Sequence, residues 1–235
     1  MKTMADSTYN DRLFSGGLRA RLHLARFHWL GASVTRFAPD YRSCLELGCY
    51  DARSIQHLPH RPQRYLGLDA DWGDGIALAR NRWSGEAGFE FRRCTRAEEM
   101  ALAGERFDLG ICLETLEHIP PERVESYLVV LADAVDWLFV SVPNEKGPVF
   151  AAKHLAKLAV VGDPEHYTLA EFINATLGRT GRVRRREHKG FDYARLIARL
   201  ERHFEILAVT GQPLAGLPLW MNFGVGVVAR ARRAS

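Results

Sequence analysis

The chain has 235 residues, of which 47% are hydrophobic and 26% are charged, values typical of one globular core or of a core with a small lid. Its formal net charge of +4 is too small to indicate nucleic acid by itself. The first six residues are polar and no apolar run is long enough to span a bilayer. We therefore expect no signal peptide, no transmembrane segment and a cytoplasmic location.

The cysteines do not indicate a zinc site or a redox pair, because none of them stands in a C-x-x-C pattern. They fall in or beside apolar, strand-like runs, where a thiol usually behaves as a small buried hydrophobic group. The four positions are Cys44, Cys49, Cys94 and Cys112.

Helical and strand-like segments alternate along the chain, which predicts an α/β fold. Residues 1–40 are expected to form a helical cover, and residues 41–235 a doubly wound, mostly parallel sheet with helices on both faces, a Rossmann-like domain. Residues 145–190 interrupt the alternation and are predicted to be an insertion on the substrate side of the sheet. The expected strands are 43–47, 65–68, 89–93, 107–113, 137–142, 204–209 and 223–229, and the expected helices are 52–57, 149–160, 169–177 and 193–203.

A glycine loop is predicted where the first strand ends and a helix begins, with the sequence LELGCYDAR over residues 45–53. Gly48 would let the backbone approach a ligand, and the helix that follows offers unpaired N–H groups. A dinucleotide enzyme would need three glycines here, but Tyr50 and Ala52 stand at the other positions. This departure disfavours a nicotinamide oxidoreductase, while a tight strand–helix turn without a ligand stays an alternative.

A second signal is Asp69, which ends the second predicted strand about twenty residues after the glycine loop. A carboxylate at this distance is typical of one that accepts hydrogen bonds from both ribose hydroxyls of a nucleoside. A turn or helix-capping aspartate is the alternative for this position.

The third signal is the segment 107–120, which reads FDLGICLETLEHIP. It resembles the fourth-strand motif of class I S-adenosylmethionine-dependent methyltransferases, and is most similar to the ubiquinone-biosynthesis O-methyltransferases and related small-molecule enzymes. The resemblance covers about residues 43–144. Its two departures are the depleted glycine loop and residues 134–137, which replace a Pro-Gly-Gly turn common in the family.

The resemblance implies S-adenosylmethionine as the cofactor and assigns roles to individual residues. The glycine loop would pass the methionine part, with Glu46 orienting its ammonium group, and the region of residues 92–99 would hold the adenine. Leu113 would lie against the cofactor. The implied cofactor-binding residues are Glu46, Gly48, Tyr50, Asp69, Ala70, Ala97 and Leu113.

Glu114, Glu117 and His118 form an E-x-x-E-H pattern, which places all three on one side if the segment is helical. Two carboxylates and an imidazole suit Mg2+ or another divalent cation. In the resembling families some quinone methyltransferases hold magnesium in this way, and small-RNA ribose methyltransferases add a histidine from beyond the fifth strand. Candidates for that ligand lie in 142–145 and 163–167, although a metal-free turn explains the same pattern.

Methyl transfer to oxygen needs a general base, and the candidates are His118 and His166. The arginines between Arg179 and Arg186 could meet an anion, but a solvated loop is the favoured interpretation. Lys153, His154 and Lys157 are expected on the polar face of helix 149–160.

The leading hypothesis is methyl transfer to a hydroxyl of a small molecule. Alternatives are a metal-dependent RNA ribose 2′-O-methyltransferase and a non-catalytic binding protein with the cofactor fold.

Overall fold

The computed structural model describes residues 17–102, 104–161, 166–186 and 188–232. The expected N-terminal cover is present as the helix α2 (Gly17–Phe37), and residues 1–16 of the predicted segment lie outside the described residues. No helix in the described parts of the chain is long and apolar enough to cross a membrane.

A seven-stranded sheet in the order β3-β2-β1-β4-β5-β7-β6 forms the centre of the described structure. Strands β1 to β5 are parallel, and β7 runs antiparallel to both β5 and β6. The predicted doubly wound α/β fold is therefore confirmed. The strands are β1 (Ser43–Leu47), β2 (Arg64–Asp69), β3 (Phe89–Arg93), β4 (Phe107–Leu113), β5 (Val135–Pro143), β6 (Phe204–Gln212) and β7 (Gly224–Ala231).

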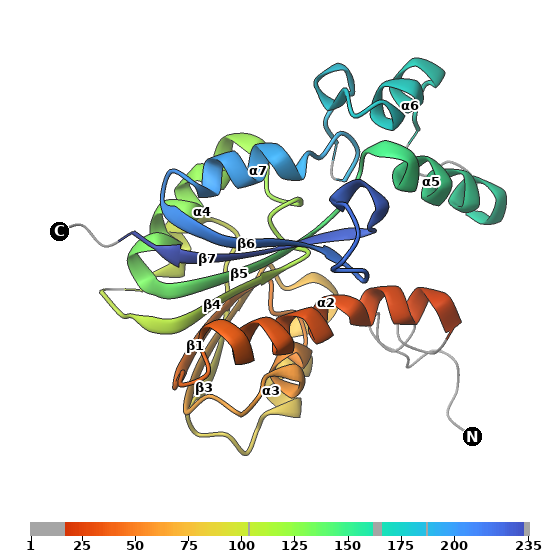
Figure 1. Ribbon diagram of the computed structural model, residues 1–235. Coiled ribbons are helices and arrows are strands. Elements are labelled where there is room, and N and C mark those ends of the chain that lie inside the picture. Colours follow the sequence, from red (N-terminus) through yellow and green to blue (C-terminus); the bar gives the residue numbers. More distant parts are fainter. Residues whose placement is uncertain (1–16, 103, 162–165, 187, 233–235) are drawn as a thin grey trace, which may run out of the picture.

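Helices cover both faces of the sheet (Figure 1). The first face carries α2, η1 (Arg53–His57) and α3 (Gly75–Arg82), and the second carries η3 (Ala97–Met100), α4 (Pro121–Ala134) and α7 (Tyr193–Leu200). Side chains of β1 alternate between the two hydrophobic clusters, with Cys44 in the first and Leu45 in the second, as strand geometry requires. All four cysteines are free and buried, as expected.

The insertion forms two helices beyond the carboxyl end of β5, α5 (Gly147–Val161) and α6 (Leu169–Thr176), followed by η4 (Thr180–Arg182). They enclose a small hydrophobic cluster of their own, which contains Phe150 and Ala175. The prediction that His154 lies on a polar face is wrong, because it is only 7% exposed and stacks on Phe150 with 5.6 Å between ring centroids. The remaining short elements are η2 (Trp72–Asp74) and η5 (Leu219–Met221).

Candidate active site

The carboxyl ends of β1, β2 and β4 meet at one edge of the sheet, because these three strands are parallel neighbours. The strand order reverses at β1, with β2 on one side and β4 on the other. Ligands of open α/β sheets bind in the crevice outside such a switch point. The predicted glycine loop, Asp69 and the turn after β4 all lie at this edge.

Gly48 is required by packing against the turn that follows β4. It has a φ of +80°, and a Cβ at this position would lie 2.0 Å from Oγ1 of Thr115. Its N–H donates to the carbonyl of Leu68 at 2.7 Å, which ties the loop to the end of β2. The close approach that glycine permits here is therefore an approach between two segments of the protein.

The loop keeps a glycine-like backbone although two of the expected glycines are replaced. Tyr50 and Ala52 have φ values of 46° and 51°, in the left-handed region that side chains with a Cβ disfavour. The ring of Tyr50 packs against Gly75 at the start of α3, where a Cβ would lie 2.6 Å from it. The depleted motif therefore preserves the loop's shape at a cost in backbone strain.

Ala52→Gly is expected to change the free energy of unfolding by less than about 0.5 kcal/mol, because the relief of left-handed strain offsets the lost methyl contact and the added chain entropy. Ala79→Gly is a matched control, since both alanines are fully buried and Ala79 lies in the helix α3. There the same change should cost about 2 kcal/mol. Urea unfolding of both variants measures the difference, and equal losses would contradict the strain.

Asp69 links β2 to the glycine loop. Its carboxylate accepts hydrogen bonds from the backbone N–H of Tyr50 at 2.9 Å and of Asp71 at 2.7 Å. These contacts are those of a turn aspartate, which was the alternative to a ribose-binding role for this position. A carboxylate has about four acceptor positions, so two remain for other donors, and 8% of the residue is exposed at the crevice.

Glu46 points from β1 toward the first face of the sheet and away from solvent. It is 2% exposed, and its Oε2 accepts hydrogen bonds from the hydroxyls of Ser54 and Tyr65. Burial raises the pKa of Glu46 to about 7, against the opposing effect of these two hydrogen bonds.

The buried Glu46 predicts that stability falls with rising pH. The folded-state pKa of about 7 lies above the usual 4.5, so the folded protein binds more protons than the unfolded chain between these values. The contribution is complete below pH 4.5 and is lost as the pH rises through 7. Its size is on the order of 3 kcal/mol. Glu46→Gln should flatten the free energy of unfolding over this range, whereas the exposed Glu201→Gln should leave the slope unchanged; a slope that survives Glu46→Gln would contradict the assignment.

The other predicted cofactor-binding residues lie near the same edge. Ala70 is half-buried directly after β2, whereas Leu113 and Ala97 are 7% and 4% exposed. The side chains of Leu113 and Ala97 belong to the two hydrophobic clusters on opposite faces of the sheet.

The helical condition under which Glu114, Glu117 and His118 would share one side is not met, because residues 114–118 form a turn. Glu114 has a φ of 51°, and α4 begins only at Pro121. Pro120 and Pro121 keep a helix from running through Ile119 into α4, since a residue before proline is disfavoured in the helical region. The Glu114 carboxylate accepts a hydrogen bond from the Ser141 hydroxyl at 3.1 Å.

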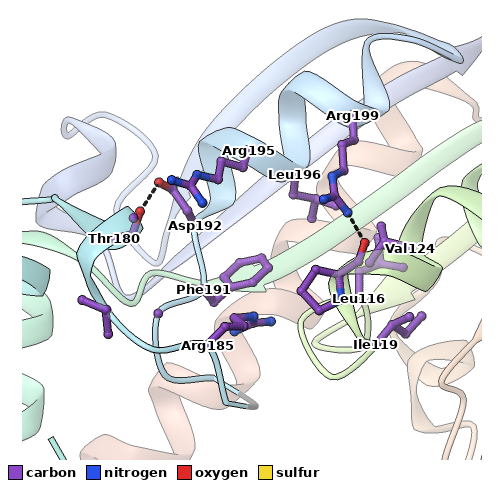
Figure 2. Close-up of a pocket in the computed structure, with 14 residues that line it drawn as sticks. Leu116, Ile119, Val124, Thr180, Arg185, Phe191, Asp192, Arg195, Leu196 and Arg199 are labelled. Carbon is purple, nitrogen blue, oxygen red and sulfur yellow. Dashed lines mark hydrogen bonds between the residues drawn. The ribbon is translucent and has the colours of Figure 1, made fainter. Parts of the chain in front are cut away.

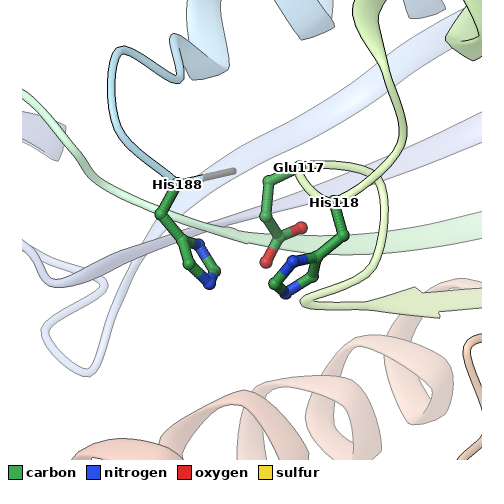
Figure 3. A group of neighbouring side chains, drawn as sticks. All are labelled: Glu117, His118 and His188. Carbon is green, nitrogen blue, oxygen red and sulfur yellow. The ribbon is translucent and has the colours of Figure 1, made fainter. Parts of the chain in front are cut away.

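The turn brings Glu117 and His118 beside His188, from the loop before α7 (Figure 3). One carboxylate or imidazole atom from each residue lies within 4.8 Å of the others, and the two imidazole centroids are 4.4 Å apart. Glu117 is 1% exposed, and neither of its carboxylate oxygens has a hydrogen-bond partner among the described residues. Burial, followed by the charge of Glu114, raises its pKa well above the usual range. We call these three residues the Glu117 cluster.

His188 was not predicted from the sequence. The Glu117 cluster also differs from the predicted metal ligands, which were Glu114, Glu117 and His118. Glu114 is not part of the cluster. His188 follows the basic stretch and has no spacing relation to His118, so only the tertiary fold brings them together. Glu145, a candidate from 142–145, is buried and pairs with Lys153 at 2.5 Å.

His166 is exposed and is not a member of the Glu117 cluster. Its backbone carbonyl accepts a hydrogen bond from Nζ of Lys189 at 2.9 Å. Residues 163–165, which were candidates for a further ligand, lie outside the described residues.

Arg185 differs from the other arginines of its stretch. Its guanidinium donates to the backbone carbonyl of Glu117 and lies 5.1 Å from the ring centroid of Phe191. Burial lowers its pKa, so the side chain is partly removed from water. The solvated positions expected from the sequence are found for Arg179, Arg182, Arg184 and Arg186, which are exposed.

Comparisons with known proteins show what part of the chain is similar to. Residues 45–133 match a family model described as a methyltransferase domain. The chain is similar to a ubiquinone biosynthesis O-methyltransferase of Leptothrix cholodnii, with 25% identity over 155 residues, covering 63% of this chain and 64% of that protein. It thus spans about 64% of the length of this curated relative.

Solved structures agree on the fold. The N-methyltransferase NodS from Bradyrhizobium japonicum, in complex with S-adenosyl-L-homocysteine, has a TM-score of 0.59 and 14% identity over 95% of this chain and 97% of its own. The small RNA methyltransferase HEN1 has a TM-score of 0.62 and 16% identity over 91% of this chain and 26% of its own. Residues 45–133 are therefore similar to a methyltransferase domain, and the described chain has the Rossmann-like fold of these solved methyltransferase structures.

Proposed function

We propose that the chain transfers a methyl group from S-adenosylmethionine to a hydroxyl oxygen of a small-molecule acceptor. The observation that carries the proposal is the meeting of three features at one edge of the sheet. They are the loop at Gly48, the carboxylate of Asp69 and the turn that presents Glu117 and His118. The similarity to a small-molecule O-methyltransferase supports the acceptor class.

The residues at this edge fit the cofactor. The two acceptor positions that remain on Asp69 suit the two hydroxyls of a ribose. Gly48 and Tyr50 are partly exposed beside it, and the backbone of this loop would face the methionine part. When bound, S-adenosylmethionine supplies an electrophilic methyl group on a sulfonium.

The Glu117 cluster is suited to the deprotonation of a hydroxyl acceptor. His118 is exposed, so its imidazole is accessible to a substrate, and an imidazole has a pKa near neutrality. Glu117 in its ionised form would stabilise the imidazolium that forms. Holding the acceptor oxygen in line with the methyl group supplies the other part of the acceleration.

A divalent cation fits the same three side chains. The support is the buried Glu117 carboxylate, which has no hydrogen-bond partner among the described residues and lies beside two imidazoles. Two imidazole nitrogens and one carboxylate oxygen suit a borderline cation such as Mn2+ or Zn2+ better than Mg2+. Bound there, such a cation would lower the pKa of a coordinated hydroxyl.

A metal-dependent RNA ribose 2′-O-methyltransferase is the second candidate. It is favoured by His188, which adds a histidine from beyond β5 to the cluster, in the way that the resemblance to small-RNA methyltransferases suggested. The exposed arginines of residues 179–186 would then contact phosphates.

Labelled methyl transfer into phenols, sugars and short RNAs, with Mn2+, with Mg2+ and with a chelator, separates these candidates. We expect methylation of a hydroxylated small molecule. Preferred labelling of RNA 3′ ends that a chelator abolishes would establish the second candidate instead. Cofactor binding without transfer to any acceptor would favour a non-catalytic binding protein, and failure to bind the cofactor would remove the enzyme interpretation.

A further inference from the structure

A second cavity lies beside the Glu117 cluster, between the turn after β4, the loop before α7 and α7 itself (Figure 2). Its volume is about 180 Å³. None of the predicted cofactor-binding or catalytic residues lines it. It is therefore separate from the crevice at Gly48 and Asp69.

The walls of this cavity are apolar. They include Leu116 and Val124 beside the turn after β4, Val183 and Phe191 from the segment before α7, and Leu196 of α7. Each of these residues is at most 7% exposed, so the walls are part of the folded core. A closed apolar cavity of about 150 Å³ is enough to hold a benzene ring, so a ligand with one ring matches the space.

The rim of the cavity is positively charged. Arg195 and Arg199 project from α7, and Arg185 reaches the cavity from the opposite loop. The acidic residue among the lining residues is Asp192, whose carboxylate pairs with Lys146 and accepts the Thr180 hydroxyl at 2.7 Å. Three arginines and one carboxylate thus line the cavity, and Lys146 already neutralises that carboxylate.

Two of the arginines are held in place by backbone carbonyls. Arg199 donates to the carbonyl of Pro121, and Arg185 donates to that of Glu117. A guanidinium has five N–H donors, so the bond to one carbonyl leaves Arg199 able to donate to an anion as well. Because apolar walls under a basic rim suit a molecule with an apolar body and one anionic group, the cavity has the chemistry of a small-molecule site.

We propose that this cavity binds a small amphipathic acid, an aromatic or branched carboxylate whose apolar body lies among Leu116, Val124 and Leu196 and whose carboxylate contacts the arginine rim. The site goes beyond methyl transfer and does not depend on it. The site nevertheless adjoins the Glu117 cluster, because Arg185 lines the cavity and donates a hydrogen bond to the backbone carbonyl of Glu117.

Calorimetry of the full chain without cofactor tests the site, with benzoate as the probe and benzamide as its neutral counterpart. We expect saturable binding of one benzoate, at least about 10-fold tighter than benzamide, because a charge-assisted hydrogen bond to arginine is lost in the amide. Equal affinities, or no saturable binding of benzoate, would overturn the proposal. Methyl resonances of Leu116, Val124 and Leu196 should shift with benzoate, and shifts confined to other residues would also overturn it.

Two arginine variants complete the test. Arg195→Gln changes an exposed rim residue, so the fold should be retained, and benzoate affinity should fall at least about 5-fold while benzamide affinity stays unchanged. Arg182→Gln is the matched control, because Arg182 is also exposed, lies in η4 beside the cavity residue Val183, and does not itself line the cavity. Equal effects of the two variants on benzoate binding would contradict a specific rim.

Discussion

Replacing Asp69 by alanine is expected to lower the affinity for S-adenosylmethionine at least about 100-fold, since two hydrogen bonds to a charged acceptor are lost. The variant also removes the acceptor for the N–H groups of Tyr50 and Asp71, so the glycine loop loses one of its attachments to β2 and keeps the bond from Gly48 to the Leu68 carbonyl. Calorimetry with S-adenosylmethionine and with S-adenosylhomocysteine measures the effect.

Two further variants separate these contributions. Asp69→Asn keeps an oxygen acceptor without the charge, and we expect an intermediate loss. Asp74→Asn is the control, since Asp74 is exposed beyond the end of β2 and asparagine tolerates its φ of 59°. Unchanged cofactor affinity in Asp69→Ala would remove this residue from the site.

Glu117→Gln is expected to lower kcat about 100-fold and to raise thermal stability at the same time. Turnover falls because the amide neither stabilises an imidazolium nor serves as an anionic metal ligand. Stability rises because a buried carboxylate without a hydrogen-bond partner among the described residues is costly to desolvate, and the neutral amide is less so. Affinity for the cofactor should stay within about 2-fold, since transition-state interactions are separable from ground-state binding.

Steady-state kinetics and thermal unfolding of the metal-free protein measure both effects of Glu117→Gln. Glu122→Gln is the control, because Glu122 is exposed in the first turn of α4. A variant that is both fully active and less stable than the parent would show that Glu117 has a structural role. Loss of activity without a stability gain would contradict the view that the carboxylate is kept at an energetic cost.

The central strands of the sheet were predictable from local sequence because they are buried on both faces. Continuous apolar runs at β1 and β4 gave the bounds that the structure has, Ser43–Leu47 and Phe107–Leu113. The later strands β5, β6 and β7 extend beyond their predicted ends, where pairing between β7 and its two neighbours continues past the apolar residues. No helix was predicted at the positions of α3 and α4, which both pack on the sheet.

The site was predictable only in part, because several of its contacts depend on the tertiary fold. The E-x-x-E-H pattern pointed to Glu117 and His118. It grouped Glu114 with them only on the condition that the segment is helical, and the segment is a turn. His188 and Arg185 belong to a stretch whose composition indicates a solvated loop, and it is packing against the turn after β4 that buries Arg185. His154 was misplaced for a similar reason, since aromatic neighbours in α6 and before it cover it.

A crystal structure of the chain with S-adenosylhomocysteine is the most direct measurement. We expect the nucleoside above the carboxyl ends of β1 and β2, with both ribose hydroxyls donating to the Asp69 carboxylate at about 2.5 to 3.0 Å. The sulfur should face the turn that carries His118. A ligand bound elsewhere, or one whose ribose makes no contact with Asp69, would contradict the account.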